Sequence, residues 1–339
     1  MECTIIGVDL AKRVFQLHWV EMKTGEIFRR QLKRQQVAEF FNNHVPCVIA
    51  MEACGSAHYW GRKFSTMGHE VRLIAAQFVR PFVKSNKTDT ADAQAIWEAA
   101  QRPGMKFVAL KTEEQQSVLT LHRMREQLVK MRTMQINQLR GLLYEFGADL
   151  PPGRQKAITK ITEELAQLEE NLSALIIDAI REQLRRIEVL SQDIARIEKK
   201  LLLWKKQNET SKKLMEIPGV GLLTATAAVA TLGNAQAFKS GREFAAFLGL
   251  VPRQSGTGGR VKLMGISKRG DVYLRTLLIH GARSVIHNQK KHTPWLEKLL
   301  LRLPHNAAAV ALANKMARTI WALMAYERTF QKDYADSIV

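Results

Sequence analysis

The sequence predicts an α/β domain followed by a long helical segment and a second, mainly α-helical domain. Near the N-terminus, short apolar runs end in acidic residues, a pattern typical of buried strands. From about Thr112 the apolar residues recur at three- and four-residue steps, which indicates long helices. After about Ser211, turns rich in Gly and Pro separate further apolar segments. We therefore expect domains at residues 1–110, 111–208 and 209–335.

The first domain is expected to contain a mixed sheet with crossover helices. A hairpin is predicted at Lys23-Thr24-Gly25, which has the composition of a turn between two alternating runs. The predicted strands are 4–9, 14–20, 25–30, 47–52 and 70–74, and the predicted helices are 36–44 and 53–67.

Four acidic residues of this domain are candidates for a metal site. Asp9 and Glu52 each follow a predicted strand, and Asp89 and Asp92 lie three residues apart in the stretch Lys87–Ala93, at the first turn of a predicted helix. Carboxylates brought together in this way suit Mg²⁺ or Mn²⁺. The alternative is that Asp89 caps the helix and Asp92 interacts with its dipole.

Acids at strand ends, with two more on a following helix, are the arrangement of the ribonuclease H-like fold. In such a site two metal ions about 4 Å apart clamp a phosphodiester oxygen and stabilise the attacking and leaving groups. Carboxylates that converge without a cation would repel one another, which favours a metal site.

The composition indicates a polyanionic partner. The net charge is +19, whereas aromatic residues make up only 7% of the chain, so we expect phosphate contacts to dominate over base stacking. Three cysteines, Cys3, Cys47 and Cys54, are expected to be reduced core residues of a cytosolic protein. No signal peptide is predicted, and Lys315 and Arg318 make the longest apolar helix a poor membrane span.

The middle segment is predicted to be a helical spacer. Its apolar spacing is that of a coiled coil sustained over several heptads. The alternatives are a helical hairpin folded on itself and a coiled coil between two chains. The predicted apolar positions are Val118, Leu121, Leu128, Met131, Leu139 and Leu142, then Ile161, Leu165, Leu168, Leu172, Leu175, Ile180, Leu184, Ile187, Ile194, Ile197 and Leu201.

In the last domain, Ile217-Pro218-Gly219-Val220-Gly221 resembles a helix-hairpin-helix. Its glycines, Gly219 and Gly221, would let backbone amides approach a phosphate at the start of the second helix. The alternative is a plain turn between two core helices.

A glycine-rich basic loop is predicted at residues 253–262. Ser255 or Thr257 is a candidate nucleophile toward phosphate, and the alternative is a flexible nucleic-acid-binding loop without covalent chemistry. His280 and His287 are expected to serve in packing or phosphate contacts. The basic residues expected to hold a DNA or RNA backbone are Arg253, Arg260, Lys262, Lys268 and Arg269.

These motifs, in this order, resemble those of the DEDD transposases of insertion-sequence family one-ten, in particular its one-one-one-one subgroup. The N-terminal domain of these proteins is similar to the Holliday-junction resolvase RuvC. The resemblance covers nearly the whole chain and rests on Gly7–Asp9, Met51–Gly55, Lys87–Ala93, Ile217–Gly221, Gly249–Arg253 and Ile266–Asp271.

The resemblance implies a recombinase guided by a structured non-coding RNA, a bridge RNA that pairs with donor and target DNA. It also implies that Asp9, Glu52, Asp89 and Asp92 bind the metal and that a C-terminal serine forms a phosphoserine link to DNA. We assign this serine to Ser255 because its Ser-Gly step matches the family, although the loop departs from the usual pattern. Thr257 and Ser267 are the alternatives.

Family members work as homo-oligomers, dimers or tetramers, in which the RuvC-like domain of one subunit meets the serine domain of another. The expected location is the bacterial cytoplasm, on nucleoid DNA. Two other functions compete with the recombinase: a metal-dependent junction endonuclease that hydrolyses DNA without a covalent intermediate, and a non-catalytic nucleic-acid-binding scaffold.

Overall fold

The computed structural model describes residues 4–83, 88–163 and 165–331. Cys3 and Lys87, and the side chain of Leu165, lie outside what is described. The chain forms two compact units, which we call the α/β unit (Met1–Gln116) and the helical unit (Ser117–Val339). None of the helices within the described ranges is long and apolar enough to cross a membrane.

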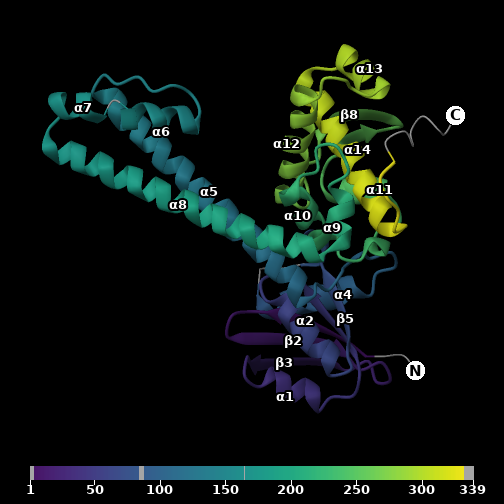
Figure 1. The fold of residues 1–339 in the computed structure, drawn as a ribbon. Coiled ribbons are helices and arrows are strands. Elements are labelled where there is room, and N and C mark those ends of the chain that lie inside the picture. Colours follow the sequence, from purple (N-terminus) through teal and green to yellow (C-terminus); the bar gives the residue numbers. More distant parts are fainter. Residues whose placement is uncertain (1–3, 84–87, 164, 332–339) are drawn as a thin grey trace. The chain divides into compact units, whose positions relative to one another are not determined.

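The α/β unit is built on a six-stranded sheet with the order β3-β2-β1-β4-β5-β6 (Figure 1). The first three strands are antiparallel, β1, β4 and β5 run parallel, and β6 is antiparallel to β5. The strands are β1 (Ile5–Leu10), β2 (Val14–Val20), β3 (Ile27–Lys33), β4 (Val48–Glu52), β5 (Glu70–Ile74) and β6 (Phe107–Val108). The helices are α1 (Val37–Asn42), α2 (Ala57–Thr66), α3 (Ala76–Val79), the 3₁₀ turn η1 (Arg80–Phe82) and α4 (Asp89–Ala100).

The two faces of this sheet bury different helices. Alternation along β1 sends Ile6 and Val8 to one face, where they share a core with Phe41 of α1 and Trp60 of α2. On the other face, Ala50 of β4 belongs to a smaller core with the alanine-rich side of α4, which includes Ile96. The mixed sheet is consistent with a ribonuclease H-like domain, and the predicted strand at residues 70–74 is confirmed.

Within the helical unit, four helices form an extended arm, drawn in blue-green and teal in Figure 1. Arg125 on α5 bonds Glu198 on α8, and Arg132, seven residues further on, bonds Ser191, seven residues back. The two helices therefore pack antiparallel within one chain. The arm helices are α5 (Glu113–Glu145), α6 (Arg154–Glu163), α7 (Leu165–Asn171) and α8 (Ala174–Gln207).

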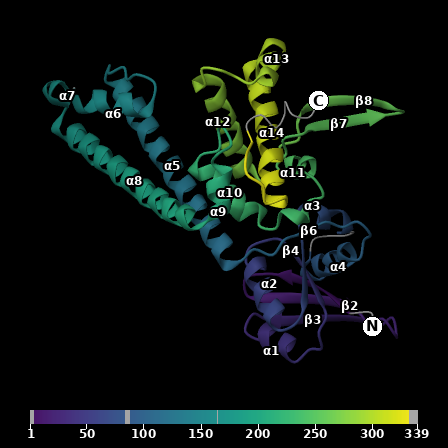
Figure 2. The same ribbon diagram turned by 45° about the vertical axis from the view of Figure 1, so that its right-hand side comes forward.

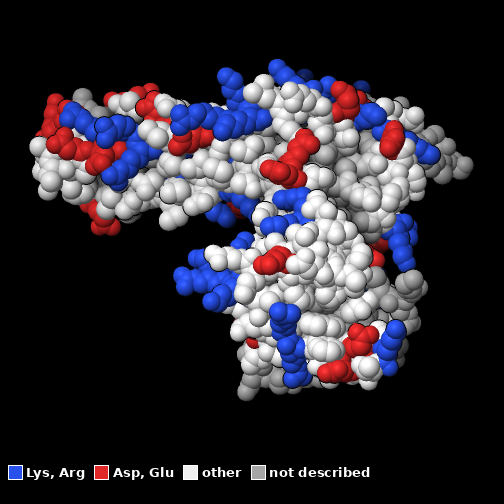
Figure 3. Space-filling view, turned by 90° about the horizontal axis from the view of Figure 1, so that it is seen from below, with Lys and Arg blue, Asp and Glu red and all other residues white. Residues whose placement is uncertain are grey.

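The predicted apolar stripes of the arm are correct in most positions and wrong in three. Ile136 and Leu139 of α5 share a buried core with Ile180 and Ile187 of α8. Met131, Leu142 and Leu175 were expected to be part of the apolar stripe, but they are 46%, 53% and 79% exposed because they lie on the outer sides of the helices. Acidic and basic side chains alternate along the arm surface in Figure 3.

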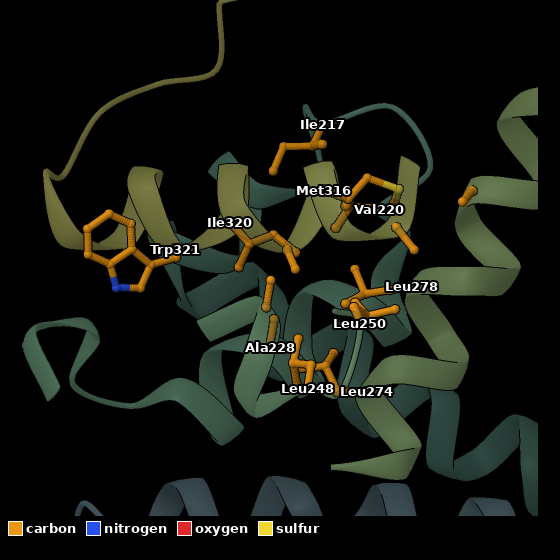
Figure 4. Packing of buried hydrophobic residues seen from close by; sticks show 14 of the residues in the cluster. Ile217, Val220, Ala228, Leu248, Leu250, Leu274, Leu278, Met316, Ile320 and Trp321 are labelled. Atoms are coloured by element: carbon orange, nitrogen blue, oxygen red, sulfur yellow. The ribbon is translucent and has the colours of Figure 1, made fainter. Parts of the chain in front are cut away.

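The remaining part of the helical unit is a globular helical domain. Figure 4 shows its core, where Leu248 and Leu250 pack with residues of α12 and α14 such as Leu278 and Ile320. The helices of this domain are α9 (Glu209–Leu214), α10 (Leu222–Leu232), the 3₁₀ turn η2 (Ala235–Ala237), α11 (Gly241–Phe247), α12 (Val272–Asn288), α13 (Pro294–Arg302) and α14 (His305–Ala325).

The segment predicted as a glycine-rich loop is instead a β-hairpin. Strands β7 (Pro252–Thr257) and β8 (Arg260–Ile266) pair antiparallel and form a ribbon that extends from the helices of its domain (Figure 2). Gly258 and Gly259 both have positive φ, 55° and 80°, which is the requirement of a tight two-residue hairpin turn. The prediction failed because Gly and Ser dilute the strand signal and because both strands are mostly exposed.

Candidate active site

Asp9 and Glu52 lie side by side in the sheet. Their strands are parallel and adjacent, and the register that pairs Gly7 with Ala50 brings the two acids to neighbouring positions two residues later. Because side chains alternate, both carboxylates lie on the face that carries Gly7 and Ala50, which is the face covered by α4.

Asp89 and Asp92 come from the first turn of α4. The helix begins after Thr88, whose hydroxyl accepts a hydrogen bond from the Ala91 amide at 3.2 Å. The alternative prediction that Asp89 caps the helix is therefore wrong, because Thr88 is the capping residue. The Asp89 carboxylate is exposed, and Asp92 is half-buried.

Gly7 lets α4 approach the sheet closely. A Cβ atom at this position would lie 2.4 Å from the Ala93 carbonyl oxygen and 2.8 Å from the Trp97 Cβ, so any side chain would force the helix away. Ala93 follows Asp92 directly in α4. The contact at Gly7 therefore fixes the height of Asp92 above the strand that carries Asp9.

These four residues, which we call the acid cluster (Asp9, Glu52, Asp89 and Asp92), interact electrostatically. The pKa of Asp9 is raised from 3.8 to about 6, first by burial and then by the negative charges of Asp92, Asp89 and Glu52, in that order. Acids from one neighbouring strand and one helix thus act on the Asp9 carboxyl group.

The donor set of the acid cluster fits a divalent cation, although the four carboxylates are not close enough together to enclose one. Carboxylate oxygens are the ligands that Mg²⁺ and Mn²⁺ prefer, and mutual repulsion at Asp9 is the electrostatic condition that a cation relieves. Within residues 4–83, 88–163 and 165–331, however, no three Asp, Glu, His or Cys side chains are close enough to form a ready ligand set. The carboxylates would need to move toward one another to enclose an ion.

Cys54 borders the acid cluster, contrary to the prediction that it lies in the core. Cys47 is buried as predicted, but Cys54 is exposed, and burial of its sulfur followed by the charges of Glu52 and Asp9 raises its thiol pKa. Ser56, two residues later, has a φ of 67° before α2 begins. Such a conformation is uncommon for a residue other than glycine.

Ser255 lies in β7 of the exposed hairpin. It pairs with Lys262 of β8, and Thr257 pairs with Arg260, so these four side chains share one face of the ribbon. Ser267, the other alternative, lies after β8, where its amide donates to the Val251 carbonyl at 2.9 Å. The hairpin thus carries two hydroxyls and two cations on one side.

The base of the hairpin is held by Arg275, a residue that the sequence analysis missed. Its side chain is 7% exposed, and its guanidinium donates to the carbonyls of Leu248 and Arg269, each at 2.8 Å. These carbonyls lie on the two chain segments that flank the hairpin. The sequence does not show that Arg275 is buried, because an arginine at an exposed position of the same helix would give the same pattern.

The other predicted nucleic-acid contacts are in the helical unit. Gly219, with a φ of 85°, packs against Gly281 of α12, where a Cβ would lie 2.8 Å from the Gly281 oxygen, whereas Gly221 at the start of α10 has open space around it. The predicted basic residues all have exposed side chains: Arg253, Arg260, Lys262, Lys268 and Arg269.

Comparison with known proteins identifies the family. Residues 6–147 match the DEDD transposase domain of IS110-type elements, and residues 211–296 match the transposase IS116/IS110/IS902 family. A protein of Pseudomonas aeruginosa named a probable family 20 transposase is 47% identical over 98% of this chain and 99% of its own length. The chain belongs to the IS110/IS116/IS902 family of transposases.

Other relatives of this transposase carry names of specific elements. The transposase for IS1111A of Coxiella burnetii is 43% identical over 96% of this chain and 91% of its own length. The transposase for IS1328 of Yersinia enterocolitica is 40% identical over 97% and 99%. The predicted family resemblance is confirmed, and the transposase is an enzyme that cuts and rejoins DNA.

Proposed function

We propose that this transposase moves its insertion sequence through the acid cluster and the Ser255 hydroxyl. The observation that carries the proposal is the coupling of Asp9 on β1 to Glu52 on β4 and to Asp89 and Asp92 on α4, because such a cluster favours a divalent cation. Mg²⁺ or Mn²⁺, when bound, would supply positive charge against the scissile phosphate. In this proposal the protein itself contributes the oxygen donors and the nucleophile.

In the proposed chemistry, the Ser255 Oγ attacks the scissile phosphorus. The Oγ–P bond forms as the bond from phosphorus to the leaving DNA oxygen breaks; the serine proton is released, and the leaving oxygen takes up a proton to become a free hydroxyl. Lys262, opposite Ser255 in the hairpin, stabilises the negative charge that develops on the phosphate. Attack by the hydroxyl of a second DNA strand releases Ser255 and joins the DNA.

The proposal includes a structured non-coding RNA that pairs with donor and target DNA. Support comes from the family motifs and from the net charge of +19, which suits two nucleic-acid partners. We also propose a homo-oligomer, a dimer or tetramer, in which the acid cluster of one subunit serves the hairpin of another. Sequencing RNA that copurifies with the protein tests the guide.

Trapping a covalent adduct tests the serine. Purified transposase with its copurified RNA is incubated with labelled DNA carrying the ends of its own element, then denatured and separated by size. We expect DNA to migrate with the wild-type protein and with the control Thr257→Ala, but not with Ser255→Ala. An adduct that persists in Ser255→Ala transfers the role to Thr257 or Ser267. Cleaved DNA without any adduct favours the hydrolytic endonuclease, and cleavage unchanged in Asp9→Asn contradicts a catalytic role for the acid cluster.

A further inference from the structure

The sheet face that carries Asp9 continues across β2 to the edge strand β3. Strand pairing aligns Asp9 with Gln16 and Gln16 with Gln31, so these three side chains form one row across three strands. Directly paired residues of antiparallel strands project to the same face. Two strand spacings separate the ends of the row, about 10 Å.

Two cations flank this row on the same face. Arg29 pairs with His18, and Lys33 pairs with Val14, which places one cation on each side of Gln31. The charge of Arg29 contributes to the lowered pKa of His18, after burial, which agrees with its position above this face. Arg29, Gln31 and Lys33 are all exposed.

Helix α4 covers only the inner part of this face. Its Trp97 packs on Gly7 of β1 and against the His18 ring of β2, with ring centroids 5.3 Å apart. Gln16 is 8% exposed beneath this cover, whereas the side chains of β3 are open to solvent beside it. The row therefore leads from an open, cationic edge to the acid cluster.

The opposite face of β3 has a different chemistry. There, Arg30 lies over the Phe40 ring at 4.9 Å and Arg34 over the Trp60 ring at 5.3 Å, so both cations cover the apolar core. In the parts of the chain that the structure describes, Arg29 and Lys33 form no ion pair with an acid. Their charges remain available to an external anion.

We propose that Arg29, Gln31 and Lys33 form a binding track for the phosphate backbone of the DNA strand that enters the acid cluster, with the buried Gln16 lying between this track and Asp9. The inference rests on the proposed function of that cluster. Gln31 lies two strand spacings, about 10 Å, from Asp9, so one bound DNA strand can contact both the track and the acid cluster. Amide and guanidinium donors suit phosphate oxygens. Charges on an edge strand also prevent sheet-to-sheet association, but that role does not require alignment with Asp9.

Site-specific cross-linking tests the track in the full-length protein. A photoreactive residue, p-benzoylphenylalanine, replaces Gln31 in one variant and Arg30, on the opposite face of the same strand, in the control. Each is irradiated with a labelled DNA duplex in chelator, so that the result does not depend on cleavage or on the adduct of Ser255. We expect DNA cross-links from position 31 and not from position 30. Equal cross-linking, no DNA cross-link at 31, or cross-links at 31 to copurified RNA alone overturns the proposal.

Charge removal gives a second, independent measurement. In Arg29→Gln/Lys33→Gln, two phosphate contacts are lost, and the slope of log affinity for DNA against log salt should fall by about 2. The control Arg30→Gln/Arg34→Gln removes the same charge from the other face and should leave the slope near that of the wild type. Equal slopes in both variants contradict the track, and thermal unfolding of each variant verifies that both are folded.

Discussion

Gly7 of β1 and Trp97 of α4 are in direct contact, and the contact leaves no room for a side chain at position 7. A Cβ there would lie 2.8 Å from the Trp97 Cβ. This is the point at which the helix that carries Asp89 and Asp92 rests on the strand that carries Asp9. The geometry of the acid cluster therefore depends on a residue that has no functional group.

Gly7→Ala should weaken both the fold and the cluster. We expect the α/β unit to lose about 1–3 kcal/mol of unfolding free energy, because the new methyl group forces α4 off the sheet. Adduct formation should fall further than stability explains, since Asp92 moves away from Asp9. Denaturant unfolding and adduct yield are the measurements. Gly55→Ala is the control, because a Cβ at position 55 meets nothing within 4 Å; equal effects of the two substitutions would contradict this explanation.

Asp9 should give the protein a distinct pH dependence. Its folded-state pKa of about 6 lies above the ordinary value of 3.8, so the folded state binds more protons than the unfolded state between these values. The stabilising contribution of Asp9 is therefore complete below pH 3.8 and is lost as the pH rises through about 6. Asp9→Asn removes this dependence.

Thermal unfolding from pH 4 to pH 8 measures the effect. The unfolding temperature of the wild type should fall relative to that of Asp9→Asn as the pH rises across this window. Adding Mg²⁺ at pH 8 should raise the wild-type unfolding temperature and have a smaller effect on Asp9→Asn. Parallel curves for the two proteins would mean that Asp9 is not coupled to its neighbours.

His122 should produce the opposite pH dependence. It is 1% exposed on α5 and hydrogen-bonds the Tyr273 hydroxyl at 2.9 Å and the Thr226 hydroxyl at 3.0 Å. Burial, and then the charge of Arg125, lowers its pKa from 6.5 to about 4. The unfolded state therefore takes up a proton before the folded state does, and stability present above pH 6.5 is lost as the pH falls through about 4.

The expected contribution of His122 is about 3 kcal/mol between pH 7 and pH 4. His122→Gln keeps a hydrogen-bonding side chain but cannot titrate, so its stability should be less sensitive to acid. Denaturant unfolding of both proteins at pH 7 and pH 4.5 measures the difference. The same acid sensitivity in His122→Gln would assign the effect to other groups.

The elements predicted best from the sequence are those whose buried residues recur at a regular spacing. Strand β5 was predicted with its observed bounds, and helix α5 begins next to Thr112, where the helical spacing was predicted to start, because apolar runs and three- and four-residue steps reflect burial directly. The acids Asp9 and Glu52 were found for the same reason, since each marks the end of such a run. The proximity of Asp9 and Glu52 required only that their strands be adjacent, whereas the coupling of Asp9 with Asp92 also depends on the contact of α4 with Gly7.

Other features depend on contacts that periodicity does not encode. The hairpin that carries Ser255 was predicted as a loop, because an exposed two-stranded ribbon has no buried face to impose alternation. Thr88 rather than Asp89 caps α4, and the sequence did not reveal this because Thr and Asp are both among the preferred capping residues. The outward direction of Leu175 depends on where α8 begins to pack, which heptad counting does not reveal.

Arg275 should couple the hairpin to the rest of its domain. It is buried, and its guanidinium bonds the carbonyls of Leu248 and Arg269, which flank the two strands. Arg275→Met keeps most of the volume but leaves the buried Leu248 carbonyl and the partly buried Arg269 carbonyl without their donor. We expect a loss of roughly 3 kcal/mol of unfolding free energy and a loss of adduct formation, because Ser255 is no longer held at a fixed angle to its domain.

The control is Arg283→Met, on the same helix and exposed, where the guanidinium bonds the Asn306 side chain and no other side chain of the described residues. Its effect on stability should stay within about 0.5 kcal/mol. Limited proteolysis of the Arg275→Met protein should cut in or beside the hairpin earlier than in the wild type. Loss of stability in Arg275→Met without loss of adduct yield would show that Arg275 is not needed to position Ser255. The close contact of Gly270 with the Phe247 carbonyl would then be sufficient to hold the base of the hairpin.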